Sequence, residues 1–86
     1  MVDIVLKLVK PEIEVSTVAN TVYDCALFRV YTPTGGSDSK ITIRDSSGTL
    51  LGSMSQPAGF VEIINKATTD TVESNTAILC TPVAWK

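Results

Sequence analysis

The stretch KITIRDSSGTLLGSMSQPAGFVEIINK, residues 40–66, guides the interpretation of the whole chain. Residues 40–44 alternate polar and apolar side chains, the period-two signature of a β-strand. Asp45 and Gly48 supply the local hydrogen bonds and the positive φ that a hairpin loop needs. A second turn at residues 56–59 precedes the apolar run 60–64. The stretch therefore predicts a three-strand meander with core positions Ile41, Ile43, Val61 and Ile63 and an outer row of Lys40, Thr42, Arg44 and Glu62.

Similar strand signals recur along the chain and are separated by turn residues. They predict further strands at residues 3–9, 12–18, 22–32, 49–55 and 77–85. Residues 22–32 are apolar on both faces, so we place that strand centrally, with its second face covered or in an interface. We expect residues 60–64 to be the best-buried strand and residues 65–75 to form a loop or a short edge strand. Pro82 predicts a bulge or a sheet edge in the last strand.

The predicted elements define a fold class. No segment combines a 3.6-residue period with caps, so we expect no substantial helix. Seven to eight short strands predict a single small antiparallel β-sandwich or partly closed barrel over residues 1–86, with strands 1–18 packing in this domain or on a neighbouring subunit. An immunoglobulin domain is disfavoured, because its core Trp lies between two cysteines and Trp85 follows both.

Composition excludes several classes of partner. The net charge is -2, and the seven Lys and Arg form no basic stripe, which argues against nucleic acid as a direct partner. The N-terminal segment places Asp3 and Lys7 among its apolar residues, unlike a secretory signal. No run reaches the roughly 18 apolar residues of a membrane span. We therefore expect a soluble protein made in the cytosol, with no membrane partner.

Cys25 and Cys80 lie near opposite ends of the chain and allow two interpretations: a disulfide between sheets, or two small buried thiols. A reducing cytosol favours the thiols. The chain has no His and no cysteine pair at metal-site spacing. We expect neither a metal site nor another cofactor.

Four features resemble chemical sites, but each has a simpler explanation. Glu62 in an apolar run suits a catalytic carboxylate, yet without His or a second positioned acid an exposed or ion-paired Glu is favoured. Glu12 and Glu14 have the residue types of a glycosidase pair, on a fold too small for a sugar groove. The loop 33–39 lacks the helix that completes a phosphate site. The Asp45 loop has too few carboxylates for calcium. We therefore predict no enzyme activity.

Two non-enzymatic classes remain. One is a structural protein that assembles with its own copies or with a larger shell. The other is a monomeric module that binds a ligand or glycan through loops such as 33–39. An assembly should form oligomers and bury aromatic side chains between subunits, whereas a module should be a monomer with its aromatic side chains near the loops. The candidate interface residues are Tyr23, Tyr31, Trp85, Arg44 and Glu62.

Four segments carry a resemblance to a known family. FRVY at 28–31, KITIRDSSGT at 40–49, PAGFVEIINK at 57–66 and TDTV at 69–72 resemble the small all-β virion proteins of tailed phages, especially phages of marine cyanobacteria. The resemblance covers residues 26–85, and residues 1–18 have no counterpart in it. It implies a capsid decoration or cement role, or a neck, tail or fibre position, with no catalytic residues to carry over.

Together these observations predict a phage structural protein, most simply a capsid decoration protein that binds and stabilises the shell. Its expected partners are its own copies, in a homo-oligomer such as a trimer, and the major capsid protein or another virion protein. Its expected location is the virion, which is assembled in the host cytoplasm.

Overall fold

A computed structural model describes residues 6–85 of the chain and shows eight antiparallel strands, with no helix among these residues. The fold is therefore the small all-β sandwich that the sequence predicts. The strands are β1 (Leu6–Leu8), β2 (Ile13–Val15), β3 (Leu27–Tyr31), β4 (Ser39–Arg44), β5 (Leu50–Gln56), β6 (Val61–Asn65), β7 (Thr71–Ser74) and β8 (Ile78–Trp85).

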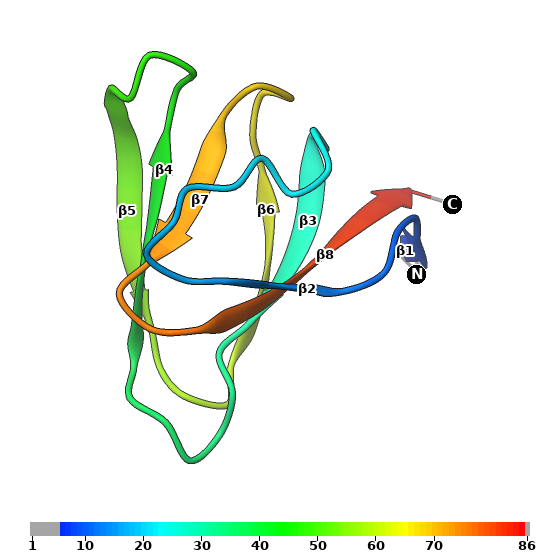
Figure 1. Ribbon diagram of the computed structural model, residues 1–86. Helices are drawn as coiled ribbons and strands as arrows, with labels where there is room; N and C mark the ends of the chain where they lie inside the picture. Colours follow the sequence, from blue (N-terminus) through cyan, green and yellow to red (C-terminus); the bar gives the residue numbers. More distant parts are fainter. Residues whose placement is uncertain (1–5, 86) are drawn as a thin grey trace, which may run out of the picture.

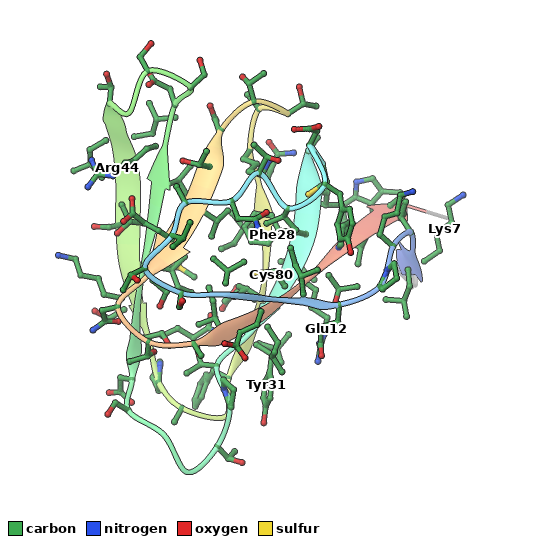
Figure 2. The ribbon with its side chains drawn as sticks, in the orientation of Figure 1. Lys7, Glu12, Phe28, Tyr31, Arg44 and Cys80 are labelled. Carbon is green, nitrogen blue, oxygen red and sulfur yellow. The ribbon has the colours of Figure 1, made fainter. Side chains whose placement is uncertain are left out.

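The strands form two sheets around one core (Figure 1). One sheet has five strands in the order β1-β8-β3-β6, with β2 also paired to β8; the other has the order β5-β4-β7. Alternate residues of both sheets point inward, as strand geometry requires. Figure 2 shows Phe28 and Cys80 in the interior. The buried core consists of Val15, Val22, Phe28, Val30, Ile41, Val72, Ile78 and Cys80.

The two sheets are joined along one side and separate along the other. After β2, the chain follows β7: Asn20 and Val72 exchange backbone hydrogen bonds of 3.0 and 2.8 Å, and the Ser74 N–H donates to the Ser16 carbonyl at 2.8 Å. No such bridge joins β5 to β6 among the described residues, although the two strands follow each other in the chain. The fold is thus closed on the β2–β7 side and open on the β5–β6 side.

The predicted three-strand meander is wrong, because its third strand lies in the other sheet. β4 and β5 pair as predicted, but β6 pairs with β3. The buried Gln56 side chain directs this crossing: its Nε2 donates to Thr32 Oγ1 at 3.1 Å and to the Phe60 carbonyl at 2.9 Å. The Gly59 N–H also donates to the Thr32 carbonyl, at 2.6 Å. The turn at residues 56–59 therefore connects two sheets.

The predicted strand 22–32 is shorter than expected, because β3 begins only at Leu27. Val22, Tyr23 and Asp24 have φ values of 54°, 59° and 55°, a left-handed turn rather than a strand. The Asn20 side chain holds this turn by accepting a 2.7 Å hydrogen bond from the Val22 N–H. The Val22 side chain is fully buried, so core packing offsets an unfavourable backbone.

The strand expected to be best buried, β6, is instead an edge strand. Val61 and Ile63 are 41% and 38% exposed, so their predicted core role is wrong. Their pairing with Tyr31 and Arg29 places them on the outer side of the sheet, while Ile64 packs against the core. The prediction failed because a continuous apolar run does not reveal which of its faces meets the core. Of the predicted core positions, Ile41 is buried and Ile43 is partly buried.

The structure agrees with the predicted loop at Asp45 and disagrees with the prediction made from Pro82. The Asp45 loop is confirmed: its Oδ1 accepts 2.9 Å hydrogen bonds from the Ser47 and Thr49 N–H groups, and Gly48 has a φ of 88°. The bulge or edge predicted from Pro82 is wrong, because β8 lies between β3 and the two N-terminal strands and its register with β3 includes Pro82 without a shift. Pro82 is tolerated there because it falls between the residues that pair with β2 and those that pair with β1.

Candidate interaction surface

The outer side of the three-stranded sheet is mostly polar, and its apolar exception is Leu50, which lies opposite Arg44 and is 56% exposed. Its cross-strand rows join Lys40 to Ser55 and Thr42 to both Ser53 and Glu73. We call this surface the polar face, and it consists of Lys40, Thr42, Arg44, Ser53, Ser55, Thr71 and Glu73. Such a surface is what a solvated antiparallel sheet normally presents.

The outer side of the five-stranded sheet is different, because apolar side chains dominate it. Tyr31 lies opposite Val61 on one strand and opposite Leu79 on the other. In the next row, Arg29 lies between Ile63 and Thr81. We call this surface the apolar face, and it consists of Leu27, Arg29, Tyr31, Val61, Ile63 and Leu79. These are partly or well exposed residues, so the sheet presents an apolar surface where its partner sheet presents a polar one.

Arg29 and Tyr31 form the polar centre of the apolar face. The Arg29 guanidinium carbon lies 5.9 Å from the centroid of the Tyr31 ring, within the range of a cation–π contact. Arg and Tyr are enriched at protein interfaces because each combines an apolar body with hydrogen-bonding groups. Neither Arg29 nor the nearby Glu14 takes part in a salt bridge within residues 6–85.

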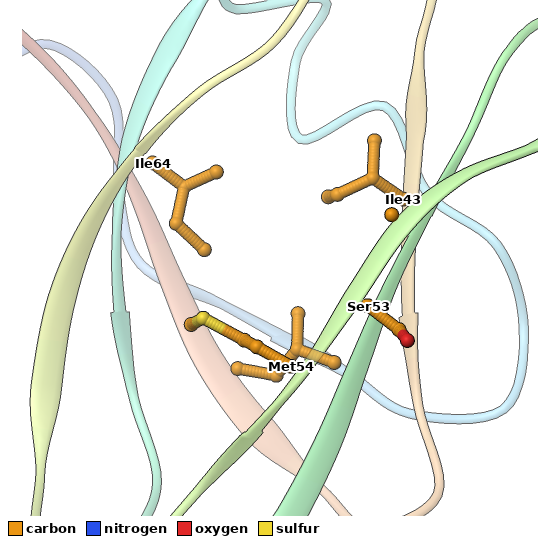
Figure 3. A pocket seen from close by; sticks show the side chains of 6 residues that line it. Ile43, Ser53, Met54 and Ile64 are labelled. Atoms are coloured by element: carbon orange, nitrogen blue, oxygen red, sulfur yellow. The ribbon is translucent and has the colours of Figure 1, made fainter.

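The open β5–β6 side carries a pocket of about 170 Å³. Figure 3 shows Ile43 and Met54 of one sheet facing Ile64 of the other across it. Gly52 lies opposite Ile43 on the inner side of β5, where a larger residue would fill the space. A Cβ placed on Gly52 meets no atom within 4 Å, so the missing side chain leaves this pocket open.

The structure disperses the five predicted interface residues. Only Tyr31 belongs to the apolar face, and Figure 2 shows Arg44 far from it. Arg44 lies on the polar face, where its Nε donates to Glu73 at 2.7 Å. Tyr23 lies in the left-handed turn, 45% exposed, and Trp85 ends β8, 59% exposed. Glu62 is exposed opposite the buried Val30, near the open side.

Sequence reasoning did not assign Leu27, Arg29, Ile63 or Leu79 to an interaction surface. One signal for this surface was present: residues 22–32 are apolar on both faces, which predicted a central strand with an interface on its second side. β3 is central, between β8 and β6. What the sequence could not supply was the register that places Ile63 and Leu79 beside Arg29 and Tyr31.

The buried Lys66 lies outside both faces and holds two turns together. Lys66 is 5% exposed, and its Nζ donates to the carbonyls of Cys25 at 2.6 Å, Ala67 at 3.3 Å and Thr68 at 3.5 Å. Burial lowers the pKa of this ammonium. Through its three hydrogen bonds, Lys66 connects the turn before β3 to the turn before β7.

Cys25 and Cys80 are free thiols, as the second interpretation of the cysteines predicted. Burial raises the pKa of the Cys25 thiol, and it raises the pKa of Cys80 to about 12. A thiol whose pKa is raised remains protonated near neutral pH and is a poor nucleophile.

Residues 6–85 contain neither a metal-binding cluster nor a membrane-spanning helix. No group of three or more His, Cys, Asp or Glu side chains in this part of the chain is arranged to hold a metal ion. No helix in the same residues is long and apolar enough to cross a membrane. The loop 33–39 borders a pocket of about 320 Å³ that has no charged residue in its lining.

Comparison with known proteins adds no identification. No protein-family model, curated protein or solved structure matches this chain.

Proposed function

We propose that this protein is a phage virion structural component, a capsid decoration protein that assembles with its own copies and binds the shell. The proposed assembly with its own copies rests on one observation: one outer face of the sandwich is mainly apolar, whereas the other is mainly polar. A monomer surrounded by water has no reason to place Tyr31, Val61, Ile63 and Leu79 in adjacent rows on one face.

The virion setting rests on the sequence resemblance to small all-β phage proteins. Two structural features are compatible with that role. The described residues offer no catalytic centre, since the free thiols are buried or protonated and the ion pair of Arg44 with Glu73 lies on the polar face without a nucleophile beside it. The remaining functional surface is the exterior of the sheets, which suits a protein whose work is contact with other proteins.

Quantitative mass spectrometry of purified virions tests this proposal. Particles of the phage that encodes the chain would be purified by density gradient, digested, and analysed with isotope-labelled peptides of this chain and of the major capsid protein. A decoration protein should be present in amounts comparable with the capsid protein. Particles without the chain would refute a virion role, and a few copies per particle would assign it to the neck, tail or fibre instead.

A further inference from the structure

We propose that the outer edge of β5 pairs with the β5 edge of a second copy of the chain, antiparallel and about a two-fold axis between the two Met54 residues. This inference rests on the proposed assembly function and names one contact between copies. The contact uses the backbone of β5 and not the apolar face.

The hydrogen-bond pattern shows which backbone groups of β5 have no neighbouring strand. In β7, Val72 directs its N–H and carbonyl to Asn20, away from β4. Backbone groups of successive residues in a strand point to opposite sides. Following this alternation from β7 through β4 to β5, the backbone groups of Met54 point to β4. Those of Ser53 and Ser55 therefore point away from β4, toward the open side.

The regular part of this edge is centred on Met54. The register of β5 with β4 runs without a shift from Gly52 to Gln56, and Met54 is the middle residue. A bulge lies before Gly52, at Leu51, and Pro57 follows Gln56 without an N–H to donate. An antiparallel copy centred on Met54 therefore covers the whole regular stretch of both strands.

The side chains fit this pairing on both sides of the sheet. On the outer side, each Ser53 lies opposite Ser55 of the other copy, and each such pair exchanges two backbone hydrogen bonds. These side chains are small and uncharged. On the inner side, the two Met54 residues lie opposite each other with Cα atoms about 4.5 Å apart. Each Met54 borders the pocket of about 170 Å³, so the flexible Met54 pair can cover this apolar opening.

The β5 edge lacks the protection that the other sheet edges within residues 6–85 have. Charged side chains, short strands and covering loops normally keep edges from pairing. Residues 46–61 carry no charge, whereas β6 has the exposed Glu62 on its inner side, opposite the buried Val30. β1 and β2 have three residues each and carry Lys7 and Glu14. β7 is covered by the chain that follows β2.

The pairing closes with two copies. Each copy contributes the same edge, so the interface is isologous, and no second β5 edge remains for a third copy. The two three-stranded sheets join into one continuous sheet across the axis. We therefore expect a particle with twice the 9.2 kDa mass of the chain.

Charges at positions 53 and 55 test the edge and its register. The double variant Ser53→Lys with Ser55→Lys places like charges opposite each other twice and should lower the dimer association constant about tenfold. The two added lysines change the net charge of the chain from -2 to 0, so general repulsion between copies cannot explain a loss. Ser53→Lys with Ser55→Glu places opposite charges against each other twice and should associate at least as tightly as wild type. Thr71→Lys, on β7 at the far side of the polar face, is the control and should leave association unchanged.

Sedimentation velocity over a concentration series at low ionic strength measures association, and far-UV circular dichroism verifies that each variant is folded. An equimolar mixture of the two-lysine variant with Ser53→Glu, Ser55→Glu should regain association, which misfolded chains could not do. A wild-type protein that sediments as a monomer at all concentrations would overturn the proposal. So would a two-lysine variant that associates like wild type, a Lys–Glu variant weakened as much as it, a mixture that regains nothing, or an equal loss in Thr71→Lys.

This experiment and the virion experiment can fail separately. A monomeric wild-type chain present in virions at capsid-like copy number would refute the β5 pairing and leave the decoration role intact. A dimer with the expected charge dependence that is absent from virions would do the reverse.

Discussion

Two glycines of the β4–β5 hairpin should respond in opposite directions to the same substitution. A Cβ placed on Gly48 or on Gly52 meets no atom within 4 Å, so neither Ala side chain would clash. The backbones differ: Gly48 has a φ of 88°, whereas Gly52 lies in β5 outside the left-handed region. We expect Gly52→Ala to stabilise the protein and Gly48→Ala to destabilise it.

The magnitudes follow from the backbone. Glycine within a strand costs about 0.5–1 kcal/mol relative to Ala, mainly through the entropy of the unfolded chain. The new methyl group at Gly52 meets open space and adds no packing contact, so the expected gain stays at about 0.5–1 kcal/mol, which corresponds to a Tm increase of about 2–8 °C. At Gly48, a left-handed Ala costs about 1–2 kcal/mol.

The assay is thermal and urea unfolding followed by far-UV circular dichroism, because the exposed Trp85 is a weak reporter of core packing. All variants are measured at one protein concentration, since association itself raises stability. The two variants should differ by about 1.5–3 kcal/mol in the free energy of unfolding. Equal effects in the two variants, or a loss of stability in Gly52→Ala, would contradict the backbone geometry described above.

Two further substitutions test the core. Burial raises the pKa of Cys80 from 9.0 to about 12, so the neutral thiol contributes stability that is complete below pH 9 and is lost as the pH rises toward 12. Between pH 8 and pH 11, wild type should lose about 3 kcal/mol more than Cys80→Ala, which has no thiol to ionise; parallel urea-unfolding curves across this range would disprove the assignment. Gln56→Ala leaves the buried Thr32 Oγ1 without its donor, whereas the Phe60 carbonyl keeps the Thr32 N–H, and the change should cost about 1–3 kcal/mol by urea unfolding. Ser55→Ala, the exposed neighbour, should change stability little, and a similar small effect in Gln56→Ala would show that the crossing does not depend on this amide.

Local features were the most predictable part of the fold. The Asp45–Gly48 hairpin needs only an acceptor and a residue that tolerates positive φ, and both are visible in the sequence. The alternation in β2, with Ile13 and Val15 inward, is likewise a local property, and so is the interruption at Pro11.

Long-range pairing was not predictable from the same signals. The turn 56–59 is compatible with a hairpin or with a crossing between sheets, and the choice depends on where the Gln56 amide finds its acceptors. The turn at Val22 could not be foreseen, since three consecutive non-glycine residues with positive φ contradict local preference. The apolar face depends on both outcomes, because β6 must leave β5 and pair with β3 to build it.

The position of β8 in the sequence also affects the order in which the strands can pair while the chain is being synthesised. β8 joins β1, β2 and β3, yet all three precede it in the chain. During translation these segments emerge before the strand that connects them, while β4, β5 and β7 can already pair with one another. A nascent chain that stops before Ile78 therefore has one complete sheet and several unpaired strand edges, so a chaperone that covers exposed edges would be most useful during this interval.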